Sequence, residues 1–274
     1  MKIRMIASDL DGTLLDPSGH ITERTLRALN AAYGQGIRLV AATGRSLHAL
    51  PEDLFKVDRV DRAITSNGSS IFSLTTGERI YGIDMHPITV RRILDIARAH
   101  ALTYEIFISG SSYCSEAYYR DPVRYSGSPR AVSYVHTTRT PVADLDAFAA
   151  DHISRIEGMD FIISDPVHKA EIHRLLKAIP DLYITSSSGY YLEMADHRVS
   201  KAAALMRIAR EYDIRPEEIL VFGDGINDLE MFSAAGHSAA MGNAREELKA
   251  AAEQVILSNA EDGIAAFLEQ HLLI

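Results

Sequence analysis

Short apolar runs alternate with helical repeats along the first part of the chain. Residues 2–8 alternate weakly and predict a strand, and the run IRLVAA at 37–42 predicts a strand buried on both faces. Between them, apolar residues recur at helical spacing behind the cap residue Thr22: Leu26, Leu29, Ala32 and Tyr33. A further strand is expected at 63–66. This part therefore predicts the order strand, helix, strand, helix, strand.

The last third of the chain repeats this alternation. Helices are expected at 201–213, near 226–234, near 245–253 and near 262–271, and strands at 219–222 and near 238–241. Short apolar strands that alternate with helices are typical of a parallel sheet covered by helices on both faces. The two ends of the chain therefore predict an α/β fold with a Rossmann-like parallel sheet.

The segment at about 82–190 has a different pattern and is rich in tyrosine. Strands are expected at 103–109, 160–164 and 182–187, and helices at 88–100 and 167–178. This predicts an α+β domain inserted into the first one. Residues 1–81 and 191–274 would then complete one discontinuous core domain together.

Composition narrows the classes of protein that remain. The chain has 274 residues, a formal net charge of −9 and one cysteine, Cys114. An acidic chain is a poor candidate for binding nucleic acid, and one cysteine fits a reducing cytosol. The start MKIRMIASDLDG meets acidic residues too early for a secretory signal, and no apolar run approaches membrane-spanning length. We therefore expect a cytoplasmic protein with no membrane or nucleic-acid partner.

Polar residues follow the predicted strands where each strand ends. Asp9 and Asp11 come after the first strand, and three further stretches follow the others: ATGRS at 42–46, SNGSS at 66–70 and GDGINDLE at 223–230. In a parallel α/β sheet, ligands bind beyond the carboxyl ends of the strands. These four stretches are therefore expected to converge on one edge of the sheet.

Three alternative interpretations of the first acidic stretch are weaker. A turn explains one Asp-x-Asp-Gly-Thr stretch but not several polar strand ends in register. A calcium loop fails on spacing, because Thr13 stands at its fifth position and His20 stands where glutamate is required. A metal–nucleotide site explains the carboxylates, but it leaves the separate Thr-Gly and lysine elements unexplained.

The types of residue at these strand ends favour phosphate chemistry. The carboxylates of Asp9, Asp11, Asp224 and Asp228 would repel one another unless a cation joined them, and Mg²⁺ suits such oxygens together with phosphate. A metal-held carboxylate can attack phosphorus. A second carboxyl can protonate the leaving oxygen and then activate water.

A phosphate group also needs hydrogen-bond donors and positive charge. Thr43 offers a hydroxyl, Gly44 an accessible N–H near a helix start, and Lys201 an ammonium at the start of a helix with Ser200 as cap. Each has a purely structural alternative: a buried strand-end hydroxyl for Thr43 and a solvated surface charge for Lys201. For Asn227 the alternative is turn chemistry.

The motifs match a known family in their order along the chain. They are DLDGTLL, ATGR, the lysine of VSKAAAL, GDGINDLEM, AMGNA and NAEDG. The chain resembles the haloacid dehalogenase superfamily, and within it the Cof-type phosphatases, whose cap domain is inserted between the second and third motifs. Where relatives often carry glycine around the lysine, this chain has Arg198 and Ala202.

The resemblance implies a role for each matching residue. Asp9 would be the nucleophile that forms an aspartyl-phosphate, and Asp11 the general acid and then base. Mg²⁺ would be held by Asp9, by the backbone carbonyl of Asp11 and by Asp224, with support from Asp228. The phosphate would be held by the N–H of Leu10 and by a further set of residues: Thr43, Gly44, Lys201 and Asn227.

The leading hypothesis is a magnesium-dependent phosphatase that acts on small phosphorylated metabolites. Sugar phosphates, nucleotides and phosphorylated cofactors all remain open as substrates. A phosphomutase would use the same motifs, and a non-catalytic module could use the pocket to bind a phosphate ligand. A receiver-like module, however, has no reason to keep an acid at Asp11 and a large inserted domain. The sequence predicts no oligomeric state.

Several residues of the inserted segment could select a substrate. Its tyrosines could stack on a sugar or base, although packing within a β-rich layer is the favoured interpretation: Tyr104, Tyr113, Tyr118, Tyr119, Tyr125 and Tyr134. Its basic residues could contact a second anion, although solvated surface charge is favoured: Arg120, Arg124, Arg130 and Lys169. His136 and His197 have no partners recognisable in the sequence.

Overall fold

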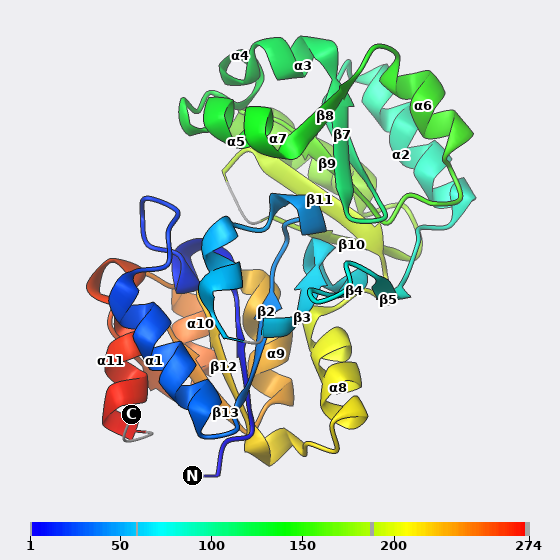
Figure 1. Cartoon of the computed structure of the whole chain (residues 1–274). Coiled ribbons are helices and arrows are strands. Elements are labelled where there is room, and N and C mark those ends of the chain that lie inside the picture. Colours follow the sequence, from blue (N-terminus) through cyan, green and yellow to red (C-terminus); the bar gives the residue numbers. More distant parts are fainter. Residues whose placement is uncertain (1, 59, 187–188, 272–274) are drawn as a thin grey trace. The chain divides into compact units, whose positions relative to one another are not determined.

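The computed structural model describes residues 2–58, 60–186 and 189–271, apart from the side chain of Arg130. The chain divides into two compact units, each with its own strands and helices (Figure 1). Unit 1 comprises Met1–Arg45, Leu50–Ile80 and Ser200–Ile274, and unit 2 comprises Ser46–Ala49 and Tyr81–Val199. Unit 1 is therefore built from segments that are far apart in the sequence.

Unit 1 is organised around one sheet, which in the described residues has the strand order β14-β13-β12-β1-β2-β3-β4-β5. Its strands are β1 (Met5–Ser8), β2 (Arg38–Ala42), β3 (Val60–Thr65), β4 (Ser70–Ser73), β5 (Arg79–Gly82), β12 (Ile219–Gly223), β13 (His237–Ala240) and β14 (Gln254–Val255). The strands from β14 to β3 pair in parallel, which confirms the α/β fold class. β4 pairs antiparallel with β3 because the short turn between them cannot connect parallel strands.

Helices cover both faces of this sheet. They are α1 (Glu23–Gly34), α8 (Lys201–Glu211), α9 (Leu229–Ala234), α10 (Glu246–Ala251) and α11 (Gly263–His271). α1 packs beside α11 and α8 packs beside α9, on opposite faces of the sheet (Figure 1). The predicted helix caps are confirmed: the Thr22 hydroxyl accepts the N–H of Thr25, and the Ser200 hydroxyl accepts the N–H groups of Ala202 and Ala203.

One element predicted for the first part of the chain is wrong. The expected helix between the second and third strands is replaced by two short 3₁₀ segments, Leu47–Ala49 and Glu52–Lys56. Pro51 explains this break, because its ring lacks an N–H donor and disfavours helical geometry at Leu50. The expected helix near 226–234 likewise begins with a 3₁₀ turn, Ile226–Asp228, before α9 starts.

Unit 2 contains a mixed sheet with the order β10-β11-β9-β6-β7-β8 in the described residues. Its strands are β6 (Thr103–Ile108), β7 (Ser111–Ser115), β8 (Arg139–Val142), β9 (Gly158–Ile162), β10 (Leu182–Thr185) and β11 (Tyr191–Asp196). Its helices are α2 (Pro87–Ala99), α3 (Glu116–Arg120), α4 (Pro122–Ser126), α5 (Arg130–Thr138), α6 (Leu145–Asp151) and α7 (Pro166–Leu176). The sequence pattern predicted β6, β9, β10, α2 and α7, and Ser187 of the expected third strand lies outside the described residues.

The tyrosines of unit 2 pack within its own layers, as favoured from the sequence. Tyr104 and Tyr118 are buried, and the rings of Tyr118 and Tyr125 meet edge to face with centroids 5.8 Å apart. Tyr119 lies against the ring of His136 at 4.8 Å between centroids. These rings therefore contribute apolar area to the unit.

Four further candidate residues of unit 2 have local partners, whereas the side chain of Arg130 lies outside the described part of the chain. The Arg120 guanidinium pairs with Glu116, and the Lys169 ammonium donates to the Ser186 hydroxyl at 2.8 Å. His136 Nε2 lies 2.7 Å from the carbonyl oxygen of Tyr119, and His197 Nδ1 lies 3.4 Å from Asp196. Both histidines thus have partners that sequence spacing did not reveal.

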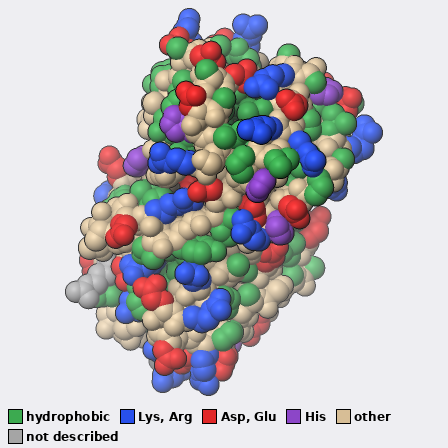
Figure 2. Space-filling model, turned by 90° about the vertical axis from the view of Figure 1, so that its right-hand side faces the viewer, with side chains coloured by type: hydrophobic (Ala, Val, Ile, Leu, Met, Phe, Trp, Pro, Cys, Tyr) green, Lys and Arg blue, Asp and Glu red, His purple; other side chains and the backbone are tan. Residues whose placement is uncertain are grey.

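The surface of the molecule carries charges of both signs. On the face drawn in Figure 2, basic and acidic side chains are interspersed rather than gathered into one basic stripe. A nucleic-acid interface is typically a continuous basic surface, so this face does not have that character. Among the helices in the described part of the chain, none combines the length and the apolar character needed to cross a bilayer.

Candidate active site

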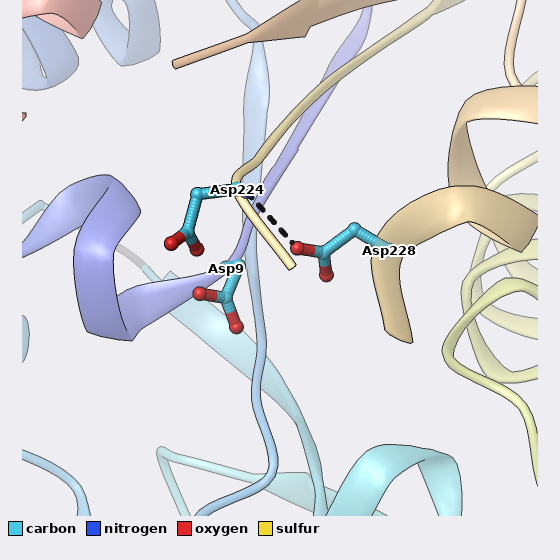
Figure 3. Close-up of side chains that lie close together, drawn as sticks. All are labelled: Asp9, Asp224 and Asp228. Atoms are coloured by element: carbon cyan, nitrogen blue, oxygen red, sulfur yellow. Dashed lines mark hydrogen bonds between the residues drawn. The ribbon is translucent and has the colours of Figure 1, made fainter. Parts of the chain in front are cut away.

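Two neighbouring strands of unit 1 end in aspartates. Asp9 follows β1 and Asp224 follows β12, and these strands pair in parallel with Ser8 opposite Phe222. Asp228 is added by the 3₁₀ turn after β12. Oxygens of the three carboxylates lie within 4.8 Å of one another. Figure 3 shows the three side chains gathered together. The shared sheet edge thus brings together acids more than 200 residues apart in sequence.

Lys201 supplies the positive charge of this cluster. Its Nζ donates to Asp9 Oδ1 at 2.7 Å and to Asp228 Oδ1 at 2.8 Å, and its side chain has no exposed surface. Burial acts to lower the pKa of Lys201, but the carboxylates of Asp228 and Asp9 outweigh it and raise that pKa. Lys201 is therefore a buried ammonium, and the solvated-surface interpretation is wrong.

Asp228 organises the loop that carries Asp224. Its Oδ2 accepts the backbone N–H of Asp224 at 3.1 Å (Figure 3). The same oxygen accepts the backbone N–H of Gly225 at 3.0 Å. A side chain at Gly223 would place Cβ 2.6 Å from Asp228 Oδ2, which leaves room for glycine only. The fully buried Asp228 carboxylate thus bonds both to Lys201 and to the backbone beside Asp224.

The cluster carries more negative charge than Lys201 offsets. Burial raises the pKa of Asp9, and Lys201 opposes this shift while Asp228 and Asp224 add to it. Burial and the Asp228 charge raise the pKa of Asp224 to about 6, against a hydrogen bond from the Thr13 hydroxyl. A divalent cation among these hard oxygen donors would relieve the repulsion, so the residues fit Mg²⁺.

Asp11 lies apart from the three clustered carboxylates. Arg45 holds its carboxylate in a two-point ion pair, with Nε at 2.8 Å from Oδ2 and a terminal guanidinium nitrogen at 2.6 Å from Oδ1. The Asp11 side chain is 59% exposed. The chain turns away from the strand at Gly12, whose φ is +80° and whose Cβ would lie 2.3 Å from Asp224 Oδ2. This turn separates the carboxylates of Asp9 and Asp11.

The predicted phosphate residues lie at neighbouring strand ends. Thr43 follows β2 and is buried, and its hydroxyl accepts the N–H of Arg45 at 3.1 Å. Gly44 follows it directly, as Leu10 follows Asp9. The Asn227 side chain donates from Nδ2 to Asn67 Oδ1 at 2.9 Å. The sequence analysis assigned no role to Arg45 or Asn67, although both lie within the strand-end stretches ATGRS and SNGSS.

The two late motifs hold the loop that follows Asp11. Asn243 of AMGNA donates to the carbonyl oxygen of Gly12 at 2.7 Å. Asn259 of NAEDG donates to the carbonyl oxygen of Leu15 at 2.7 Å, and its N–H donates to Asn243 Oδ1 at 3.0 Å. These side chains stabilise the turn on which the separation of Asp9 and Asp11 depends.

Comparison with known proteins agrees with this geometry. A family model described as haloacid dehalogenase-like hydrolase matches residues 6–268. Phosphatase YwpJ of Bacillus subtilis is 28% identical, over 99% of this chain and 100% of that protein. The 5-amino-6-(5-phospho-D-ribitylamino)uracil phosphatase YcsE of the same organism is 26% identical, over 99% of this chain and 96% of that protein.

Solved structures give the same result. A haloacid dehalogenase-like hydrolase from B. subtilis superposes with a TM-score of 0.86 at 26% identity, covering 98% of this chain and 100% of that one. The sequence resemblance and the parallel-sheet fold are thereby confirmed. Because the family model spans nearly the whole chain, the protein belongs to the haloacid dehalogenase-like hydrolases and is an enzyme of their phosphatase class.

Proposed function

We propose that the protein is a magnesium-dependent phosphatase that hydrolyses small phosphorylated metabolites through an aspartyl-phosphate on Asp9. The observation that carries the proposal is the cluster of Asp9, Asp224 and Asp228 around the buried Lys201. Such a cluster joins a carboxylate nucleophile to an ammonium group and to oxygen atoms that would hold a cation, and these positive charges would offset the charge of a phosphate. The proposed metal ligands are Asp9, the backbone carbonyl of Asp11 and Asp224, with Asp228 in support.

In the first half of the proposed reaction, a carboxylate oxygen of Asp9 forms a bond to phosphorus as the ester P–O bond breaks. Asp11 protonates the leaving oxygen, so an alcohol departs and an acyl phosphate remains on Asp9. When bound, Mg²⁺ supplies positive charge that favours the approach of the anionic phosphate. Lys201 orients the Asp9 carboxylate through its 2.7 Å hydrogen bond.

In the second half, Asp11 removes a proton from water, and the water oxygen attacks phosphorus. The bond from phosphorus to Asp9 breaks, which releases inorganic phosphate and restores the free carboxylate. The proposed phosphate ligands throughout are the N–H of Leu10 and four further residues: Thr43, Gly44, Lys201 and Asn227. Arg45 contributes by fixing the orientation of the exposed Asp11 carboxylate.

The substrate is proposed to be a sugar phosphate, a nucleotide or a phosphorylated cofactor. The relative YcsE, which is named for a phosphorylated ribityl compound, supports this class. The main segment of unit 2, Tyr81–Val199, has bounds similar to those of the predicted inserted segment 82–190. Unit 2 is the proposed cap that selects the leaving group. The proposed compartment is the cytoplasm, since a reducing environment suits the single cysteine, Cys114, which is buried.

The first experiment is hydrolysis of p-nitrophenyl phosphate by the full chain with and without Mg²⁺. We expect turnover with Mg²⁺, its loss on chelation and its recovery when Mg²⁺ is restored. Folded protein that shows no metal-dependent turnover would contradict the phosphatase and favour a binding module. A panel of phosphorylated metabolites then ranks substrates by kcat/KM. Transfer of the phosphate to a second hydroxyl of the substrate would instead identify a phosphomutase.

The Asp11→Asn variant tests the proposed proton transfers. We expect turnover to fall by roughly 10²- to 10⁴-fold, because an amide can neither protonate the leaving oxygen nor activate water. Binding of inorganic phosphate, measured by calorimetry with Mg²⁺ present, should persist. Normal turnover in this variant would show that another group moves the proton.

A further inference from the structure

The turn between β3 and β4 has an unfavourable local geometry. Ser66, Asn67 and Gly68 all have positive φ, at 48°, 56° and 105°. In the described residues, the buried hydroxyls of Thr65 and Ser66 have no hydrogen-bond partner. Non-glycine residues at positive φ and unpaired buried hydroxyls both cost free energy. Its surroundings must therefore hold this turn in place.

The turn contacts three segments that carry proposed phosphate ligands. The Asn67 N–H donates to the carbonyl oxygen of Thr43 at 3.0 Å, and the Ser66 N–H donates to that of Arg45 at 2.9 Å. Gly68 packs closely against Ser200, the residue that precedes Lys201, because a Cβ at Gly68 would lie 2.4 Å from the Ser200 carbonyl oxygen. The turn is thus fixed between the segment that follows β2 and the start of α8.

The side chain of Asn67 reaches the third segment. It is buried, with 6% of its surface exposed, and its Oδ1 accepts Asn227 Nδ2 at 2.9 Å. An amide nitrogen carries two N–H groups, so this bond uses one and fixes the plane of the other. Among the described residues, the Asn227 side chain makes no other hydrogen bond. Its second N–H is therefore available to a bound anion.

We propose that Asn67 is a positioning residue of the phosphate subsite and acts through Asn227. The left-handed backbone at Asn67 lets one residue do two things: its N–H holds the strand end at Thr43, and its side chain orients the Asn227 amide. A phosphoryl oxygen then meets a donor that is already aligned, which lowers the entropy cost of binding. This inference rests on the proposed function, because it assigns the anion as phosphate.

The test compares Asn67→Gly with a matched control. Glycine adopts the φ of 56° without strain, so this variant removes the acceptor while it keeps the turn. The control is Asp213→Gly, which makes the same kind of change at an exposed position with φ of 50°, beyond the far end of α8. Binding of inorganic phosphate in the presence of Mg²⁺ is measured by calorimetry, together with kcat and KM for p-nitrophenyl phosphate.

We expect Asn67→Gly to weaken phosphate binding by about tenfold and to raise KM more than it lowers kcat. Asp213→Gly should bind like the unaltered chain. In a cycle with Asn227→Ala, the double variant should bind no more weakly than Asn227→Ala by itself, because Asn67 acts through Asn227. A merely structural role would instead multiply the two losses.

Unchanged phosphate binding in Asn67→Gly, or losses that multiply in the double variant, would overturn the inference. Failure of the proposed function has a different signature. The unaltered chain would then bind phosphate but hydrolyse no ester, and the binding cycle would still decide the role of Asn67. A chain that binds no phosphate with Mg²⁺ present would contradict both.

Discussion

Both units gather three carboxylates beside one basic side chain, yet they arrange them differently. In unit 1 these residues are Asp9, Asp224, Asp228 and Lys201, and in unit 2 they are Glu105, Asp160, Glu193 and Arg139. The first group sits at and just beyond strand ends. The second sits within β6, β9, β11 and at the start of β8. The two groups contain the same kinds of ionisable group, three carboxyls and one basic side chain, but at different backbone positions.

The backbone position decides how closely the carboxylates approach. In unit 2, Glu105 lies opposite Asp160 and Asp160 lies opposite Glu193 across antiparallel strands, so strand spacing keeps them in a row. Among the described residues, only the unit 1 acids form a group whose oxygens all lie within 4.8 Å. Loops beyond strand ends can fold toward a common point, whereas positions inside a sheet cannot.

The two clusters therefore balance their charge in different ways. The Arg139 guanidinium donates two hydrogen bonds to the Glu105 carboxylate, with nitrogen–oxygen distances of 3.0 and 2.7 Å. Burial, reinforced by Glu193 and Glu105, raises the pKa of Asp160, which favours its neutral form. The negative charge of the unit 2 row is thus reduced by Arg139 and by the raised pKa of Asp160. The unit 1 cluster has the geometry to take a cation instead.

Removing one charge from the unit 1 cluster should have the largest effect. We expect Asp9→Asn to lower the turnover of p-nitrophenyl phosphate at least about 10³-fold, because an amide is a poor nucleophile. The fold should persist, as judged by circular dichroism. Appreciable residual turnover would mean that Asp9 is not the nucleophile.

Breaking the ion pair in unit 2 should instead cost stability. Arg139→Met leaves the Glu105 carboxylate, whose side chain has no exposed surface, without its cation. We expect the free energy of unfolding to fall by about 3–5 kcal/mol in urea titrations. Adding Glu105→Gln should recover much of this loss.

A matched control exists in the same unit. Arg120 pairs with Glu116 at 2.8 Å, but 75% of its side chain is exposed. Arg120→Met should cost at most about 1 kcal/mol, because exposed pairs are weak. Equal losses from Arg139→Met and Arg120→Met would show that burial of the first pair has no energetic consequence.

The smallest effect is expected from the pH dependence of stability at Asp160. Because its folded pKa lies above the unfolded value, the folded state binds more protons, and stability falls as pH rises through the folded pKa. Asp160→Asn should remove this loss of stability, because an amide does not titrate. We expect it to raise the midpoint of thermal unfolding at pH 7 by about 2–4 °C.

At a pH below the ordinary carboxyl pKa, the advantage of Asp160→Asn should disappear, since Asp160 is then protonated in both states. Thermal unfolding followed by circular dichroism between about pH 3 and about pH 8 measures this slope. An equal advantage at every pH would indicate a packing effect rather than a titration.

Local patterns predicted much of unit 1 because its strands are short, apolar and followed by polar residues. β1, β2 and β12 were readable from runs such as IRLVAA and ILVF, and their ends located Asp9, Thr43 and Asp224. The failures were also local in origin. Pro51 interrupted an expected helix, and β7 and β8 have too few apolar residues to be distinguished from loops.

Pairings between distant residues could not be read in this way. The ion pair of Arg45 with Asp11 and the bond between Asn67 and Asn227 depend on side-chain directions that follow from left-handed turns at Gly12 and Asn67. Sequence spacing contains no such directions, because each turn can leave its strand in several ways.

The sequence by itself determined which chemistry the chain can carry: its family, its parallel sheet and the carboxylates and lysine at the strand ends. Only the tertiary structure decided which of these groups contact one another. It joined Lys201 to Asp9 and Asp228, and it turned Asp11 toward Arg45. The physical reason is that residue type fixes charge and hydrogen-bonding capacity, whereas distance and burial arise only when separate segments pack together.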